Sequence, residues 1–109
     1  MAKFLIEASY TAEGLRGLAK DKASGRKQAI EAALSGLGGK LESIYFAFGA
    51  ADVYVVCECP DSVSAAALSL ATSASGLVRT TTVPLLTVEE TDQALAKKIN
   101  YRAPGAKKA

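Results

Sequence analysis

Two short apolar runs around a Gly/Asp connection constrain the fold more than any other feature of this sequence. The first run ends at Phe48, residues 49–52 (Gly-Ala-Ala-Asp) follow, and the second run ends at Pro60-Asp61. Strand-like runs on either side of such a connection predict a β-hairpin. Pro60 has no backbone N–H to continue a strand ladder, and Asp61 is a favoured helix N-cap. The second strand is therefore predicted to end there, and a helix to begin.

Residue periodicity predicts the other elements of the chain. Alternation of apolar and polar residues predicts a first strand over 3–10, and Thr11 then suits the N-cap of a short helical turn. Residues 21–25 are polar and are predicted to form a loop, and the apolar stripe of the next helix, about 24–37, recurs at helical spacing. Thr87 and Glu90 form a capping box that opens a last helix. The remaining predicted elements are strands at 40–48, 52–59 and 77–86 and helices at 62–75 and 88–99.

This succession, β-α-β-β-α-β followed by a terminal helix, predicts an α+β fold of the ferredoxin-like type. Two right-handed crossovers would place both main helices on one face of a four-stranded antiparallel sheet in the order 4-1-3-2. The chain has 109 residues, which is the size of one domain. We expect this domain to span residues 1–100 and a basic, flexible tail to span 101–109.

Charge is distributed unevenly along the chain. Residues 1–92 carry eight Lys or Arg and eleven Asp or Glu, whereas residues 93–109 carry five Lys or Arg and no acid. The basic end predicts either a solvated terminus or a site for an anionic partner such as nucleic acid or an acidic surface. No apolar run approaches the ~18 residues of a membrane span, and the N-terminus lacks the pattern of a secretory signal. We expect a cytoplasmic protein that does not contact membranes.

Several catalytic and cofactor classes are excluded by composition. The chain contains no His, which rules out Ser-His and Cys-His couples and metal or haem sites that need imidazole. It has no phosphate-binding glycine loop. Trp is absent and the basic residues outside the tail are scattered, so a nucleic-acid stacking platform is not expected. Cys57 and Cys59 cannot complete a tetrahedral zinc site within one chain, and we expect them to be small buried side chains in a reducing compartment. No metal or cofactor is expected.

A set of residues and short motifs occurs in a characteristic order and spacing along residues 3–90. They are Thr11, Gly14, Arg26, Tyr45, Gly49, Asp52, Pro60-Asp61, Gly76, Val78-Arg79-Thr80 and the segment 87–90 (Thr-Val-Glu-Glu). In these residues the chain resembles the GYD family of small, mostly uncharacterised bacterial proteins. One departure matters, because Ala51 stands where the family name has Tyr between Gly and Asp. The resemblance implies a ferredoxin-like fold of the dimeric α/β barrel type and no agreed chemistry.

A candidate ligand site follows from the predicted sheet. If Phe4, Ile6 and their neighbours face the helices, Glu7 and Glu58 share the opposite face of two adjacent central strands. Arg79 on the fourth strand would bridge the two carboxylates, with Tyr54 beside them. One interpretation is an ion-pair network at the sheet surface or a subunit interface. The other is a ligand-binding or catalytic pocket made of Glu7, Tyr54, Glu58 and Arg79.

Four further polar residues have local interpretations. Asp52 is predicted to hydrogen-bond nearby backbone within the hairpin turn. Arg26 is predicted to lie on the solvated surface of the first turn of its helix, unless an ion pair or anion holds it there. Tyr10 and Tyr45, at strand ends, are predicted to pack against neighbouring side chains, unless they line a cavity.

The open face of the sheet is also apolar, through Leu5, Tyr54, Val56 and either Tyr45 or Phe46. A second copy of the chain is the simplest cover for it. We therefore expect a non-catalytic homo-oligomeric module that binds a small molecule at this face. The alternative is a cofactor-free enzyme of the dimeric α/β barrel type that uses Glu7, Glu58 and Arg79. A third possibility is an interaction protein that works through its basic tail.

Overall fold

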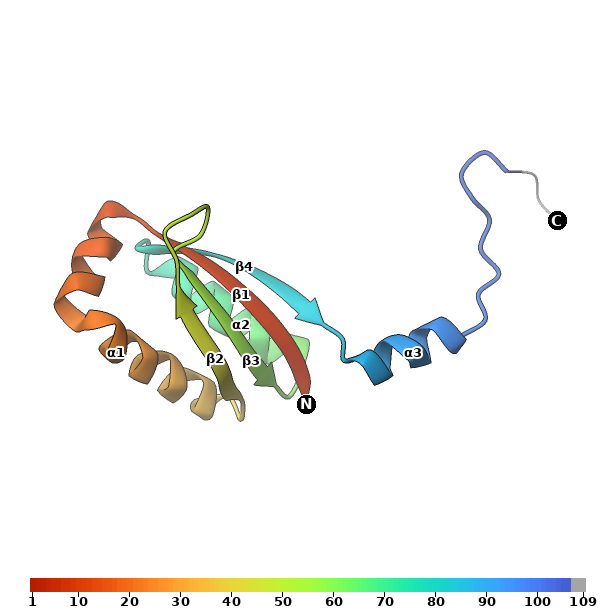
Figure 1. Ribbon diagram of the computed structural model, residues 1–109, viewed down its shortest axis with the longest axis horizontal. Helices are drawn as coiled ribbons and strands as arrows, with labels where there is room; N and C mark the ends of the chain where they lie inside the picture. Colours follow the sequence, from red (N-terminus) through yellow and green to blue (C-terminus); the bar gives the residue numbers. More distant parts are fainter. Residues whose placement is uncertain (107–109) are drawn as a thin grey trace.

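The computed structural model describes residues 1–106, which form one four-stranded sheet and three helices (Figure 1). The predicted basic tail includes Lys107 and Lys108, which lie outside the described residues. The elements in chain order are β1 (Ala2–Tyr10), α1 (Ala12–Gly36), β2 (Lys40–Phe46), β3 (Val53–Cys59), α2 (Ser62–Ala74), β4 (Val78–Leu85) and α3 (Val88–Ala96).

The sheet is antiparallel throughout and has the order β2-β3-β1-β4, which reads 4-1-3-2 from its other edge. β1 and β3 are therefore the central strands. In their register Phe4 lies opposite Cys57 and Ile6 lies opposite Val55. Because side chains alternate between faces along a strand, this register gathers the apolar set of both strands on one face.

That face is covered by α1 and α2 and forms the core. Phe4 and Ile6 of β1 and Val53 and Val55 of β3 are each at most 6% exposed. Leu34 of α1 is fully buried against them, and the small side chain of Ala65 brings α2 close to the sheet. The other face of the sheet carries no helix (Figure 1).

The helix starts follow the predicted capping. The Asp61 carboxylate accepts a hydrogen bond from the Ser64 backbone N–H at 2.8 Å, so Asp61 is the N-cap of α2. At α3, the Thr87 hydroxyl accepts from the Glu90 N–H at 3.1 Å, and the Glu90 carboxylate accepts from the Thr87 N–H at 2.9 Å. This reciprocal pair is the predicted capping box.

The loop predicted over residues 21–25 is reduced to a kink at one residue. Helix α1 runs from Ala12 to Gly36, and its backbone leaves helical geometry at Lys22, where φ is 65° and ψ is 164°. This backbone region is occupied almost only by glycine. The polar segment therefore bends one long helix sharply, and Figure 1 shows the two arms of α1 at an angle to each other beside the sheet.

Helix α3 projects away from the sheet and its two covering helices (Figure 1). Its large apolar side chains are exposed, with Val88 at 76% and Leu95 at 78%, and Ile99 beyond it is at 79%. Nine residues are fewer than the ~12–15 that a helix needs to be even marginally stable alone in water. The apolar side of α3 is therefore a surface that lacks a covering partner within residues 1–106.

Candidate functional site

The helix-free face of the sheet, called here the open face, is organised in rows that cross the strands. Directly paired residues point to the same side, so each row is read from the strand registers. An apolar row contains Val56, Leu5 and Val83 next to Ser43. The adjoining row contains Tyr45, Tyr54, Glu7 and Thr81, which we call the tyrosine–glutamate row.

The tyrosine–glutamate row combines hydrogen-bonding groups with exposed aromatic surface. Glu7 lies directly opposite Tyr54 on one side and Thr81 on the other. Tyr45 is 72% exposed, whereas Glu7 and Tyr54 are half-buried. None of these four side chains hydrogen-bonds to another group within residues 1–106. The row thus presents a carboxylate, two phenols and a hydroxyl that are free to bind a molecule placed over the sheet.

The predicted acidic pair bridged by Arg79 is not formed. Glu7 and Glu58 do share the open face, but the register places Glu58 opposite Lys3, four positions from Glu7 along β1. Four positions along a strand correspond to about 13 Å. Arg79 lies opposite Ser9, two positions beyond Glu7 and further still from Glu58. The prediction placed the right residues on the right face but misjudged how far the strands are staggered.

The cation that Glu58 approaches is Lys3. Its ammonium lies 2.6 Å from a carboxylate oxygen of Glu42 and 3.9 Å from one of Glu58. The hydrogen bond to Glu42 raises the pKa of Lys3, although burial opposes this. The register of β2 shifts between Leu41 and Ser43, and Glu42 lies at this irregularity. Sequence reasoning missed Lys3 because nothing in the local pattern reveals a bulge two strands away.

Asp52 has a long-range partner in place of the predicted turn contact. Its carboxylate accepts a hydrogen bond from the Tyr10 backbone N–H at 2.8 Å, and its own N–H donates to the Ala8 carbonyl at 2.8 Å. Asp52 therefore fastens the start of β3 to the end of β1. The hairpin is closed separately by the Ala47 N–H, which donates to the Asp52 carbonyl at 2.7 Å.

The two cysteines are buried on the helix-covered face, as predicted, and neither forms a disulfide. Burial raises the pKa of the Cys57 thiol to about 12, and the neighbouring Cys59 adds to this shift. Burial also raises the pKa of Cys59. These thiols are neutral in the folded protein and are unsuited to act as nucleophiles.

These shifts predict a loss of stability in alkali. An unfolded thiol ionises near pH 8.5, whereas the folded Cys57 binds its proton up to about pH 12. The folded state therefore binds more protons within this interval, and the free energy of unfolding must fall as pH rises through it. Urea titrations between pH 8 and pH 10.5 measure this slope. A Cys57→Ala, Cys59→Ala double variant should show a shallower slope, and an unchanged slope would contradict the assignment.

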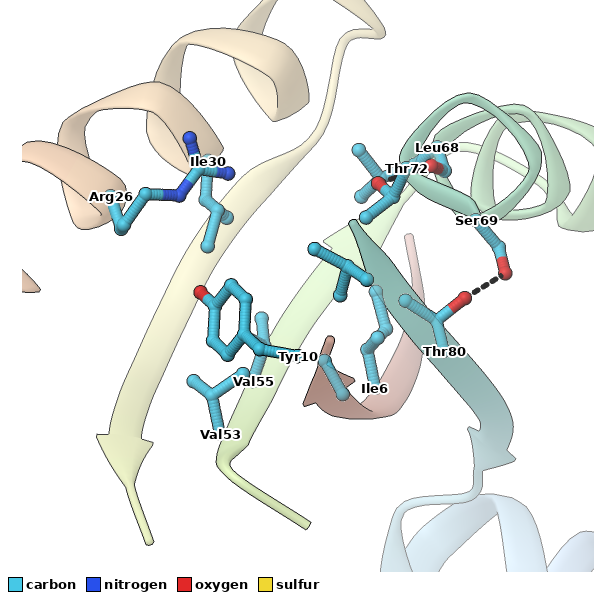
Figure 2. Close-up of a pocket in the computed structure, with 12 residues that line it drawn as sticks. Ile6, Tyr10, Arg26, Ile30, Val53, Val55, Leu68, Ser69, Thr72 and Thr80 are labelled. Atoms are coloured by element: carbon cyan, nitrogen blue, oxygen red, sulfur yellow. Dashed lines mark hydrogen bonds between the residues drawn. The ribbon is translucent and has the colours of Figure 1, made fainter. Parts of the chain in front are cut away.

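A second concave region lies on the helix-covered side, between α1 and α2 (Figure 2). Tyr10 and Arg26 both line it, and Figure 2 shows the Arg26 guanidinium and the Tyr10 phenol on its α1 side. The Arg26 side chain is 30% exposed and its guanidinium lies 3.8 Å from the Asp21 carboxylate, so the structure contains the ion pair that was the alternative to a solvated residue. Tyr10 lines the cavity, and Tyr45 lies exposed on the open face.

The described residues hold no evident metal centre and no membrane span. Within residues 1–106, no three His, Cys, Asp or Glu side chains lie close enough together to hold a metal ion. In the same part of the chain, no helix is both long and apolar enough to cross a membrane.

Comparison with known proteins places the chain in a family. The searches of curated proteins and of solved structures each returned no match to this chain. A family model, the GYD domain, matches residues 4–95, which include the sheet except the first two residues of β1, both covering helices and nearly all of α3. This match covers well over half of the sequence, and the chain belongs to the GYD domain family.

Proposed function

We propose that this protein is a non-catalytic, homo-oligomeric module of the ferredoxin-like, dimeric α/β barrel type that binds a small molecule at its open sheet face. The element order β-α-β-β-α-β and the central position of β1 and β3 support this fold type. The observation that carries the proposal is the uncovered apolar row of Val56, Leu5 and Val83 beside the exposed ring of Tyr45. Contiguous apolar surface of this kind marks interaction sites.

A second copy of the chain is the occupant that best fits this face. The apolar row runs across β3, β1 and β4, so two faces related by a twofold axis set apolar row against apolar row. The row of Lys40, Glu58 and Lys3 alternates in charge. In a twofold dimer, Lys residues of this row can therefore face Glu58 in the same row of the second copy. Helix α3, with its exposed Val88 and Leu95, supplies an arm that reaches beyond its own sheet to a neighbour.

In such a dimer, the tyrosine–glutamate row borders the space between the two sheets. Its carboxylate and phenols have no partners within residues 1–106, and enclosure between sheets would make unpaired polar groups costly. A bound polar molecule that donates to Glu7 satisfies them. The alternative, an enzyme that uses Glu7, Glu58 and Arg79, loses support from the stagger that separates the two carboxylates along β1.

A charge placed in the apolar row tests assembly. Val56→Lys should raise the dimer dissociation constant at least about tenfold, because it places an ammonium in the centre of the interface. Sedimentation velocity at micromolar concentration measures the change. The matched control is Val63→Lys on α2, where the side chain is already 77% exposed and away from the open face. A wild-type protein that is only monomeric, or equal effects of the two variants, would refute the proposal.

A further inference from the structure

The region between α1 and α2 has the features of a second binding site, on the opposite side of the sheet from the proposed interface. An inner cavity of about 50 Å³ lies over the sheet, and an open cleft of about 330 Å³ adjoins it. The same side chains, Tyr10, Arg26, Leu68, Thr72 and Val78, border both, so the two lie directly beside each other. The outer cleft alone is in the size range of small-molecule sites in proteins.

The walls of this space are mainly apolar. Ile30 of α1, Val55 of β3 and Leu68 of α2 border the inner part, and Leu18 and Leu77 border the outer part. Most of the hydroxyl groups that line it already form hydrogen bonds within the protein. Ser69 and Thr80 hydrogen-bond to each other at 2.7 Å, as Figure 2 shows, and the Thr72 hydroxyl donates to the Leu68 carbonyl at 2.7 Å.

The Arg26 guanidinium supplies the positive charge in this space. Its Nε is buried and has no hydrogen-bond partner within residues 1–106. Its one acidic neighbour is Asp21, also on α1, whose carboxylate lies 3.8 Å from Nη1, beyond the range of a good hydrogen bond. The phenol of Tyr10 lies on the same side of the cavity (Figure 2) and makes no hydrogen bond through its oxygen to residues 1–106. Two donors therefore lie beside the apolar inner cavity, whose lining includes no carboxylate, whereas the Asp21 carboxylate lines the outer cleft.

The kink in α1 is what brings these groups to the cleft. Lys22, in a backbone conformation unusual for any residue but glycine, separates the arm that carries Leu18 from the arm that carries Arg26. Both arms contribute side chains to the outer cleft, Leu18 from one and Arg26 from the other. A straight helix could not line the cleft from two directions in this way.

We propose that this cleft binds a small hydrophobic monocarboxylate. Its carboxylate accepts hydrogen bonds from Arg26 and Tyr10, and its apolar body fills the space between α1 and α2. A guanidinium matches a carboxylate with two parallel hydrogen bonds, which explains why Arg suits this position better than Lys. The inference does not depend on assembly, because the cleft and the open face lie on opposite sides of the sheet.

Octanoate and 1-octanol form a matched pair of probes, since they share an apolar chain and differ in the charged head. Titration of each into the ¹⁵N-labelled protein should shift the amide signals of Tyr10, Leu68 and Thr72, with octanoate bound at least tenfold more tightly. Arg26→Gln should weaken octanoate at least tenfold and leave 1-octanol unchanged. Arg16→Gln, an exposed substitution on the same helix, should affect neither.

Arg26→Lys separates charge from geometry, because it retains the cation and removes the buried Nε donor; it should bind octanoate more weakly than the wild type. Amide signal dispersion in each variant shows that the fold is intact. Equal affinity for the two probes, insensitivity of octanoate to Arg26→Gln, or signal changes confined to the open face would overturn the inference. A monomeric wild type that still binds octanoate through Arg26 would refute only the proposed dimer.

Discussion

Gly14→Ala is expected to lower the free energy of unfolding by about 3 kcal/mol, at the upper end of the cost of overpacking. Gly14 is buried in the first turn of α1, and a Cβ built there would lie 2.2 Å from the Leu77 carbonyl oxygen and 3.0 Å from the Tyr10 ring. Leu77 cannot retreat easily, because its carbonyl accepts the Thr11 N–H at 2.9 Å. Chemical denaturation of the purified variant measures the loss.

Gly17→Ala is the matched control on the same helix. A Cβ at this position would meet no atom within 4 Å, so only helix propensity changes. The variant should be more stable than the wild type by about 0.5–1 kcal/mol. Equal effects of the two substitutions would show that α1 does not approach β4 as closely as the structure indicates.

Leu34→Ala is expected to destabilise the protein by about 2–5 kcal/mol, the range for removing a large side chain from a tightly packed core. Leu34 is the fully buried side chain through which α1 anchors to the sheet. Its backbone carbonyl also accepts from the Leu37 and Gly39 N–H groups, so the helix end is held at this point. Thermal and urea unfolding report the change.

Leu15→Ala provides the comparison, because Leu15 lies on the same helix and is 47% exposed. Leu15→Ala should lower the free energy of unfolding by less than about 1 kcal/mol, as is usual outside a packed core. If Leu15→Ala lowered the free energy of unfolding as much as Leu34→Ala, the core contact of α1 would lie in its first arm.

Local chemistry made most of the fold predictable. The stripe containing Ile30 and Leu34, the N-cap Asp61 and the capping box at Thr87 each depend on neighbours within a few residues, and each occurs as predicted. The kink at Lys22 was not predictable, because its backbone conformation is unusual for a side chain other than glycine. The polar residues 21–25 indicate that the helix is interrupted, but they do not show whether it resumes after one residue or after a loop.

The candidate site was only half predictable for a related reason. Alternation along each strand correctly placed Glu7 and Glu58 on one face, because it depends on a single strand. The distance between them depends on the stagger of two strands, which is set by the loop around Ala51 and the Asp52 contact with Tyr10. For Arg26 the sequence indicated an ion pair or an anion contact as an alternative, but not the cavity, because its surroundings come from α2, β1 and β4, far away in the sequence.

The position of β1 in the sheet has a consequence for how the chain folds. β1 is the first strand to be synthesised, yet it is hydrogen-bonded on one side to β4, where Tyr10 pairs with Val78, 68 residues later. Pairing across such a separation is entropically costly to initiate and slows folding. A fragment that ends before Val78 leaves one edge of β1 unpaired, so we expect the four-stranded sheet to be completed only after β4 has been synthesised.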